Sequence, residues 1–174
     1  MKKYLIILLF LLSGITISFG QTLKLGYVDS QVILNQLPEA IKAQSDLDAL
    51  TNMWSSQLDS MKQAYQMSIA NYQKQQATMT EEQKVARQKD IVAMEQTLYS
   101  FQQDKFGQPN GAIYHKQEEI FNPVKQKIYA AIGTVAKEEG MQFVFDKSGD
   151  IILLYADAAF DVTYKVLDKL KRGN

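Results

Sequence analysis

The chain has 174 residues, with 19 basic and 19 acidic side chains and no cysteine. The balanced charge excludes a long-range electrostatic pull toward nucleic acid or an anionic membrane surface. The lack of cysteine excludes disulfides, thiol catalysis and thiolate metal sites.

The first twenty residues have the pattern of a signal peptide. Two lysines follow the initial methionine, an uninterrupted apolar run extends from Tyr4 to Leu12, and the small residues Ser18 and Gly20 precede Gln21. The apolar run is short for a transmembrane helix. We therefore expect residues 1–20 to be cleaved, which leaves a mature chain outside the cytoplasm with no integral membrane association.

Residues 21–38 begin the part of the chain that we interpret as a compact body. Residues 23–29 alternate in side-chain character, which predicts a strand. Asp29 can then cap a short helical turn. Pro38 fits the first turn of the next helix, where its missing N–H costs nothing.

Residues 39–79 predict one long helix, because this segment contains neither proline nor glycine. Its apolar residues recur at steps of 3, 4, 4, 3, 4, 4 and 3, an eleven-residue repeat that keeps them nearly parallel to the helix axis. About 40 residues at 1.5 Å each make a rod of about 60 Å, which must project from a chain of this size. The row that we expect to form the seam of this arm consists of Leu47, Leu50, Trp54, Leu58, Met61, Tyr65, Ile69 and Tyr72.

A second helix is predicted to run back along the first. Thr80 and Gln83 have the spacing of a capping box, and apolar residues at helical spacing follow from Ile91 to Phe101. A turn of a few residues near Met79 forces the two helices to be antiparallel. We therefore interpret residues 39–120 as one helical hairpin arm.

The returning limb is interrupted by residues 107–111. This segment contains a proline and two glycines, which are unfavourable inside a helix, so we expect a kink, a bulge or a short loop there. Pro123 can begin a further helix, and Gly140 can end it.

Residues 121–174 complete the predicted body. Residues 142–146 and 151–155 are predicted to pair as a β-hairpin, and Asp161 is predicted to cap a short C-terminal helix. The fold class is then α+β: a small β-rich oligomerisation body that carries a long antiparallel α-helical hairpin arm. Three strands leave open edges, which oligomerisation would cover. The predicted core of the body and of the oligomer consists of Leu25, Tyr27, Phe143, Phe145, Ile152 and Leu154.

The order of these segments resembles the Skp/OmpH family of periplasmic chaperones. The resemblance rests on the early strand at residues 25–29, the long Gln-rich hairpin, the segment 119–124, and a closing block at residues 143–163 that is similar to a Bacteroidetes-like branch. It implies a periplasmic homotrimer with a β-rich body and three arms that enclose unfolded outer-membrane proteins without ATP. Residues 107–111 make the returning limb of the hairpin about four residues longer than the limb that is usual in the family.

Catalysis has few candidate residues in this sequence. His115 is the single histidine, and it stands three residues before Glu118, a spacing that can share a metal on a helix. A zinc-hydrolase motif would need a second histidine where Glu119 stands. We therefore predict no catalytic, metal or cofactor site, although a secreted enzyme that uses His115 remains one alternative.

A binding surface is the better candidate. Soft apolar side chains suit a protein that holds many unfolded chains weakly, and five lie off the main row of the arm. We interpret these five residues as candidate client contacts. The alternative interpretation is that they complete a hairpin seam that is wider than one row. The function predicted is a holding chaperone, and the other alternative is a structural or adaptor coiled-coil envelope protein that binds one folded partner. The candidate contacts are Met53, Met67, Met79, Val92 and Tyr99.

Overall fold

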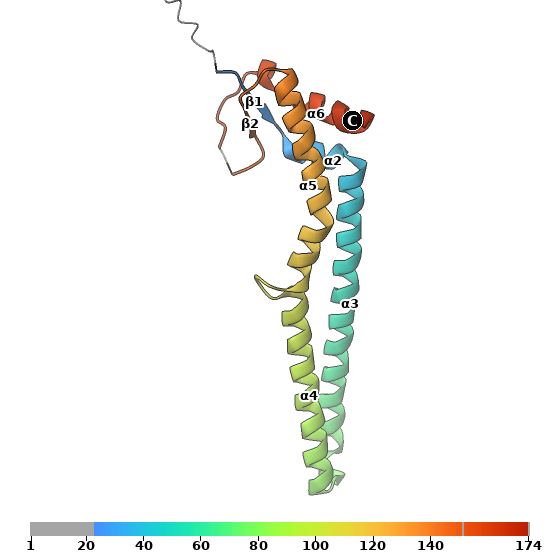
Figure 1. Ribbon diagram of the computed structural model, residues 1–174. Coiled ribbons are helices and arrows are strands. Elements are labelled where there is room, and N and C mark those ends of the chain that lie inside the picture. The colour runs from blue at the N-terminus through green and yellow to red at the C-terminus, as the bar shows by residue number, and fades with distance from the viewer. Residues whose placement is uncertain (1–22, 151, 174) are drawn as a thin grey trace, which may run out of the picture.

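The computed structural model describes residues 23–150 and 152–173, and it consists of a long helical rod on a small base (Figure 1). The predicted signal peptide, residues 1–20, lies outside the described residues. One side of the rod is α3 (Pro38–Gln75), which is followed by the short 3-10 turn η1 (Gln76–Thr78). The returning side consists of α4 (Glu81–Phe106) and then α5 (Ala112–Glu138), whose last turns belong to the base. The predicted long helical hairpin is therefore confirmed.

The base is built around two parallel strands that are far apart in the sequence. Strand β1 (Leu25–Val28) pairs with β2 (Phe143–Asp146), with Leu25 opposite Phe143 and Val28 opposite Asp146. A short helix, α2 (Ser30–Gln36), follows β1, and its N-terminus is capped by Asp29 as predicted. The chain ends with η2 (Ala158–Phe160) and α6 (Thr163–Arg172).

A single apolar core joins the base to the root of the arm. Ile33, Leu37, Val166 and Leu167 are almost fully buried at the centre of this core. The first turns of α3 and the second half of α5 pack around them, so the arm is rooted in the base and not tethered by a linker. The residues that α3 and α5 contribute are Ala40, Ala43, Val124, Ile128, Ala131 and Val135.

The seam of the arm becomes less buried with distance from the base. Leu47, Trp54 and Leu58 are buried, whereas Leu50 and the four seam residues from Met61 to Tyr72 are half-buried. Helix α4 has no fully buried residue. The reason is geometric, because two helices in contact along one row leave the sides of that row open to solvent.

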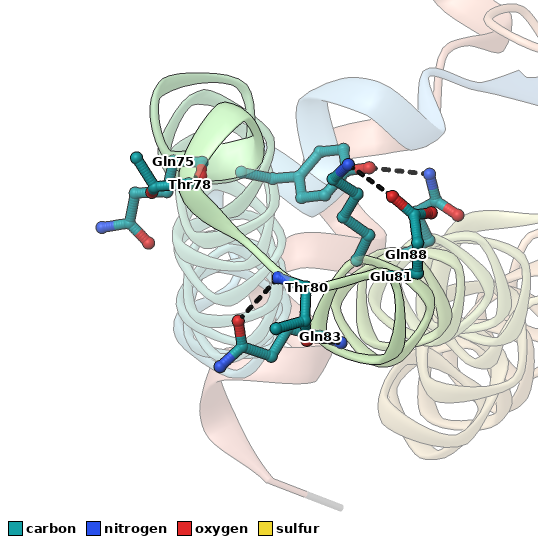
Figure 2. Close-up of polar contacts among 8 residues, drawn as sticks. Gln75, Thr78, Thr80, Glu81, Gln83 and Gln88 are labelled. Carbon is teal, nitrogen blue, oxygen red and sulfur yellow. Dashed lines mark hydrogen bonds and ion pairs between the residues drawn. The ribbon is translucent and has the colours of Figure 1, made fainter.

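The tip of the arm is closed by the predicted capping box (Figure 2). The Thr80 N–H donates to Gln83 Oε1 at 3.0 Å, and the Gln83 N–H donates to Thr80 Oγ1 at 3.3 Å. These bonds satisfy two of the amide groups that a helix start leaves without partners. The turn therefore has a defined geometry that holds α3 and α4 antiparallel.

The predicted interruption at residues 107–111 is a short loop between α4 and α5 (Figure 1). The Gly111 N–H donates to the Gly107 carbonyl oxygen at 2.5 Å, which closes the loop on itself. A Cβ atom at Gly111 would lie 2.7 Å from the Gly107 nitrogen, so only glycine fits this close approach.

The prediction that Pro123 begins a helix is wrong. Pro123 lies inside α5, which starts eleven residues earlier at Ala112 and continues to Glu138. Ile120 and Phe121 before the proline and Val124 after it all pack against the same core. This burial outweighs the cost of one lost backbone hydrogen bond. The predicted arm–body boundary after residue 120 falls within this helix, and the division into domains stays a prediction.

The predicted β-hairpin of residues 142–146 and 151–155 does not form among the described residues. Strand β2 pairs with β1, and residues 152–155 are not in a strand. Asp146 Oδ1 accepts the Ser148 N–H at 3.0 Å, and the Lys147 N–H donates to the Val28 carbonyl oxygen at 2.7 Å. With the bond that the Gln31 N–H donates to Ser148 Oγ at 3.1 Å, the Lys147 bond holds the turn residues against α2 and β1.

Asp146 is the polar clamp that links β2 to the start of α2. Its Oδ1 accepts the Ser30 N–H at 3.1 Å, and its Oδ2 accepts the Ser30 hydroxyl at 2.5 Å. Partial burial would raise the pKa of the Asp146 carboxyl, but the hydrogen bonds from Ser30 and Ser148 outweigh it and lower the pKa. The charged carboxylate also suits the positive end of α2.

Asp146→Asn should lower the free energy of unfolding by about 1–2 kcal/mol at pH 7, because the amide cannot accept all of these hydrogen bonds. A lowered folded-state pKa contributes stability that is present above the unfolded pKa of about 3.9 and lost as the pH falls through the folded value. The difference from the wild type should therefore shrink between about pH 4 and pH 2. Urea unfolding at fixed protein concentration measures the free energy of unfolding at each pH. Asp150→Asn, at an exposed position, is the control. An equal loss in both variants at pH 7 would contradict the clamp.

Candidate functional site

One row of exposed apolar side chains runs along α4. Val85, Val92 and Tyr99 are seven residues apart, so they lie on one face of the helix. Their side chains are 63%, 49% and 63% exposed. The three residues, called here the α4 stripe, contain two of the predicted contacts, Val92 and Tyr99. They form no part of the core of the chain.

A second group of apolar side chains lies on α3 and at the tip of the arm. Met53 and Met67 on α3 are more than half exposed. Near the tip, Met67, Met79 and Met94 line one hollow of about 430 Å³. Val92 and Met94 differ by two positions, which is about 200° around a helix, so the hollow and the α4 stripe face different sides. The predicted contacts are thus brought together in two groups.

Met79 and the outer seam residues are less exposed than the α4 stripe, Met53 and Met67. Met79 is half-buried in the tip turn, where it closes the end of the hairpin. Tyr72 accepts a hydrogen bond from Gln88 Nε2 at 2.7 Å (Figure 2). Burial, and then the charge of Glu95, raise the pKa of the Tyr65 hydroxyl. Tyr65 and Tyr72, both on α3, therefore face the polar residues Glu95 and Gln88 of α4 across the seam.

The tip carries four basic residues, of which Lys84 forms an ion pair. Lys84 Nζ lies 2.7 Å from Glu81 Oε1, and this hydrogen bond, with the charge of Glu81, raises the pKa of Lys84 (Figure 2). Glu81 and Glu82 in the first turn of α4 partly offset the positive charge of the tip. The basic residues are Lys74, Lys84, Arg87 and Lys89.

Trp54 stabilises the arm where α4 ends. Its ring meets Phe106 edge-on, with 6.3 Å between ring centroids, and Lys105 Nζ lies 5.1 Å from the Trp54 ring. Both contacts are of the kind that aromatic rings favour. Because Trp54 is itself buried, it belongs to the structure of the arm and is not offered to a partner.

The base also exposes large apolar side chains. Of the predicted body residues, Tyr27 is buried and Phe145 is half-buried, whereas Leu25 and Phe143 are exposed. Ile152 and Leu154 are 84% and 93% exposed, so they lie outside the core of the single chain. Their place in an oligomer core stays a prediction. Residues of β1, β2 and the 153–160 segment line a hollow of about 340 Å³ beside them.

The residues considered for catalysis and metal binding are not gathered into a site. His115 is exposed on α5. Within residues 23–150 and 152–173, no three His, Cys, Asp or Glu side chains are placed to hold a metal ion together. In the same part of the chain, no helix has the length and apolar character needed to span a bilayer.

Sequence reasoning missed two exposed apolar residues on the arm. Val85 completes the α4 stripe, and its seven-residue spacing from Val92 was a signal that the sequence contained. Ile41 is half-exposed at the root of α3. Its exposure had no local signal, because it depends on where α2 and α5 lie around α3.

Comparisons with known proteins agree with this architecture. A family model described as outer membrane protein (OmpH-like) matches residues 24–170. The chaperone protein Skp of Pectobacterium atrosepticum is 27% identical over 148 residues, which cover 85% of this chain and 86% of the relative. A solved OmpH-like structure from Caulobacter crescentus has a TM-score of 0.72 at 12% identity and covers 87% of this chain and 85% of its own. At that identity, the solved structure supports the fold alone.

The order in which the methionines are oxidised should follow the exposure of their side chains. We expect hydrogen peroxide to oxidise Met53 and Met67 first, Met61 and Met94 more slowly, and the buried Met141 last, because oxidation requires access to the sulfur. Mass spectrometry of peptides from a time course measures the order. Oxidation of Met61 ahead of Met67 would show that the seam is misassigned.

Proposed function

The chain belongs to the OmpH-like outer membrane protein family, and on this premise we propose that it is an ATP-independent periplasmic holdase for unfolded outer-membrane proteins. The likeness to a chaperone protein Skp over most of both chains supports a chaperone role. The observation that carries the proposal is the pair of exposed apolar groups on the arm, the α4 stripe and the Met53–Met67 face. Family membership also supports the predicted absence of enzymatic activity.

Exposed side chains of this kind suit weak and unspecific binding. Methionine is flexible and polarizable, so it adapts to partners of different shape. Valine and tyrosine on a rigid helix add apolar contact at low entropic cost. An unfolded membrane protein presents apolar segments and unpaired strand edges that aggregate when free. Contacts on two faces of a long arm would keep such segments apart from each other.

We further propose that three chains associate through the base and that their arms enclose a cavity for the client. Ile152, Leu154 and Tyr155 are almost fully exposed, and Tyr155 lines the same hollow as residues of β1 and β2. A soluble monomer rarely presents such a contiguous apolar patch. A second copy that covers this patch would bury it and would fix the directions of the arms.

The adaptor alternative is favoured by one feature, the seven-residue spacing of the α4 stripe. Residues spaced by seven form the contact line of a coiled coil, so a helix of one folded partner could pack along Val85, Val92 and Tyr99. An adaptor would form a tight complex of fixed stoichiometry with that partner. A holdase would instead bind several unrelated unfolded barrels with similar affinity.

Charges on the α4 stripe should weaken holdase activity. When an unfolded outer-membrane barrel is diluted from urea, light scattering should fall with added wild-type protein. The triple variant Val85→Glu, Val92→Glu, Tyr99→Glu should need at least about tenfold more protein for the same suppression, a change equal to 1.4 kcal/mol.

A matched control separates the apolar surface from the added charge. Ala86→Glu, Ala93→Glu, Ser100→Glu places the same charges at the same spacing on exposed positions of α4 and should suppress aggregation like the wild type. Circular dichroism of both variants checks that the helices are intact. No suppression by the wild type at a trimer excess over client would reject the chaperone proposal.

The oligomer should depend on the exposed segment of the base. Leu154→Glu should shift the mass measured by native mass spectrometry or light scattering from trimer toward monomer, because a buried unpaired carboxylate opposes association. Lys147→Glu changes an exposed charge before this segment and should leave the mass unchanged. A monomeric wild type, or a Leu154→Glu trimer of undiminished stability, would contradict the proposed interface.

A further inference from the structure

A groove lies at the root of the arm, where α2, α3 and α5 meet. Its volume is about 820 Å³, which makes it larger than the hollow at the tip and the hollow on the base. Its apolar lining comes from all three helices. Ile41 is half-exposed within it, and Phe121 is half-buried at the edge of the core. The apolar lining residues are Leu34, Ala40, Ile41 and Phe121.

Carboxamide side chains form much of the polar lining of this groove. Gln31 Nε2 donates to Asn35 Oδ1 at 3.0 Å along α2, and Gln44 Nε2 donates to Asp48 Oδ1 at 2.8 Å along α3. These bonds hold the side chains in defined positions. Each amide nitrogen keeps a second hydrogen and each amide oxygen a second lone pair, so the groups can still bind an occupant. Gln117 of α5 adds a further carboxamide.

The charge of the lining is balanced. Asp48 and Lys125 are its charged residues, and Lys125 Nζ also pairs with Glu118 Oε2 at 2.9 Å. A lipid phosphate or a nucleic acid would require several free cations, which this lining does not offer. The groove therefore suits an uncharged occupant that combines apolar side chains with many amide hydrogen-bonding groups.

We infer that the root groove binds an extended, uncharged segment of an unfolded membrane β-strand, which deepens the proposed function and rests on it. Such a strand alternates apolar and polar residues. Its apolar side would lie on Leu34, Ile41 and Phe121, and its unpaired backbone N–H and C=O groups would meet the carboxamides. Because backbone groups are common to all sequences, this contact is independent of client identity.

The dimensions of the groove agree with a short segment. Its lining on α3 extends from Ala40 to Asp48, which is about 12 Å along the helix axis. An extended chain covers that distance in about four residues. The groove would thus hold one short stretch of a strand, while the apolar groups farther out on the arm contact other parts of the same client.

The test uses the mature full-length protein and a synthetic probe. The probe is a fluorescent eight-residue peptide in which valine or tyrosine alternates with threonine or serine, and fluorescence anisotropy measures its dissociation constant. Ile41→Glu should weaken binding at least tenfold, because it places a charge on the apolar lining. Ala49→Glu adds the same charge to an exposed position of α3 outside the groove lining and should bind like the wild type.

A second probe tests the role of the backbone. The same peptide, methylated on alternate amide nitrogens along one edge, cannot donate hydrogen bonds there and should also bind at least tenfold more weakly. No saturable binding to the wild type, unchanged binding to Ile41→Glu, or equal affinity for both peptides would overturn the inference.

The two proposals fail in different ways. Aggregation of the unfolded barrel is followed in the same preparations. One outcome is that the wild type suppresses aggregation while the dissociation constant of the peptide is unchanged by Ile41→Glu or by backbone methylation. In that case the holdase proposal stands and the groove inference is overturned. If the peptide results are as expected but aggregation is not suppressed, the groove is a strand-binding site and the holdase proposal is rejected.

Discussion

The structure depends on the contact of α3 with the returning limb along one apolar row. Leu47, Trp54 and Leu58 bury this row near the base, and farther out the same row is only half-buried. A pair of helices has no third neighbour to cover its sides, so any apolar residue beside the seam stays in contact with water. The long arm and its exposed apolar surface are therefore two consequences of one arrangement. A compact bundle of the same helices would lose both.

The base supplies the stability that the arm lacks. It joins β1 to β2 across more than a hundred residues, and the root of the arm shares its core. Ile33 and Leu37 of the N-terminal segment pack with Val166 and Leu167 of α6, so both ends of the described chain hold the arm between them. Asp146 adds a polar clamp between β2 and α2. This shared core fixes the root of the arm to the base.

The apolar groups that remain exposed differ in kind along the molecule. The base presents the aliphatic Ile152 and Leu154, which suit a permanent interface with another copy. The arm presents separated methionine, valine and tyrosine side chains, which suit weak and repeated contact. The root groove between these regions adds carboxamides, which can satisfy the backbone of an extended chain. Under the proposed function, one molecule would combine surfaces for assembly with surfaces for transient binding.

The sequence by itself determined the features that depend on neighbours along the chain. The seam from Leu47 to Tyr72, the capping box at Thr80 and the interruption at Gly107 follow from helical spacing, capping chemistry and the conformational limits of proline and glycine. Only the tertiary structure decided the partner of β2, the continuation of α5 through Pro123, and the exposure of Ile41. These features depend on contacts between residues far apart in the sequence, where burial in a shared core outweighs local preference.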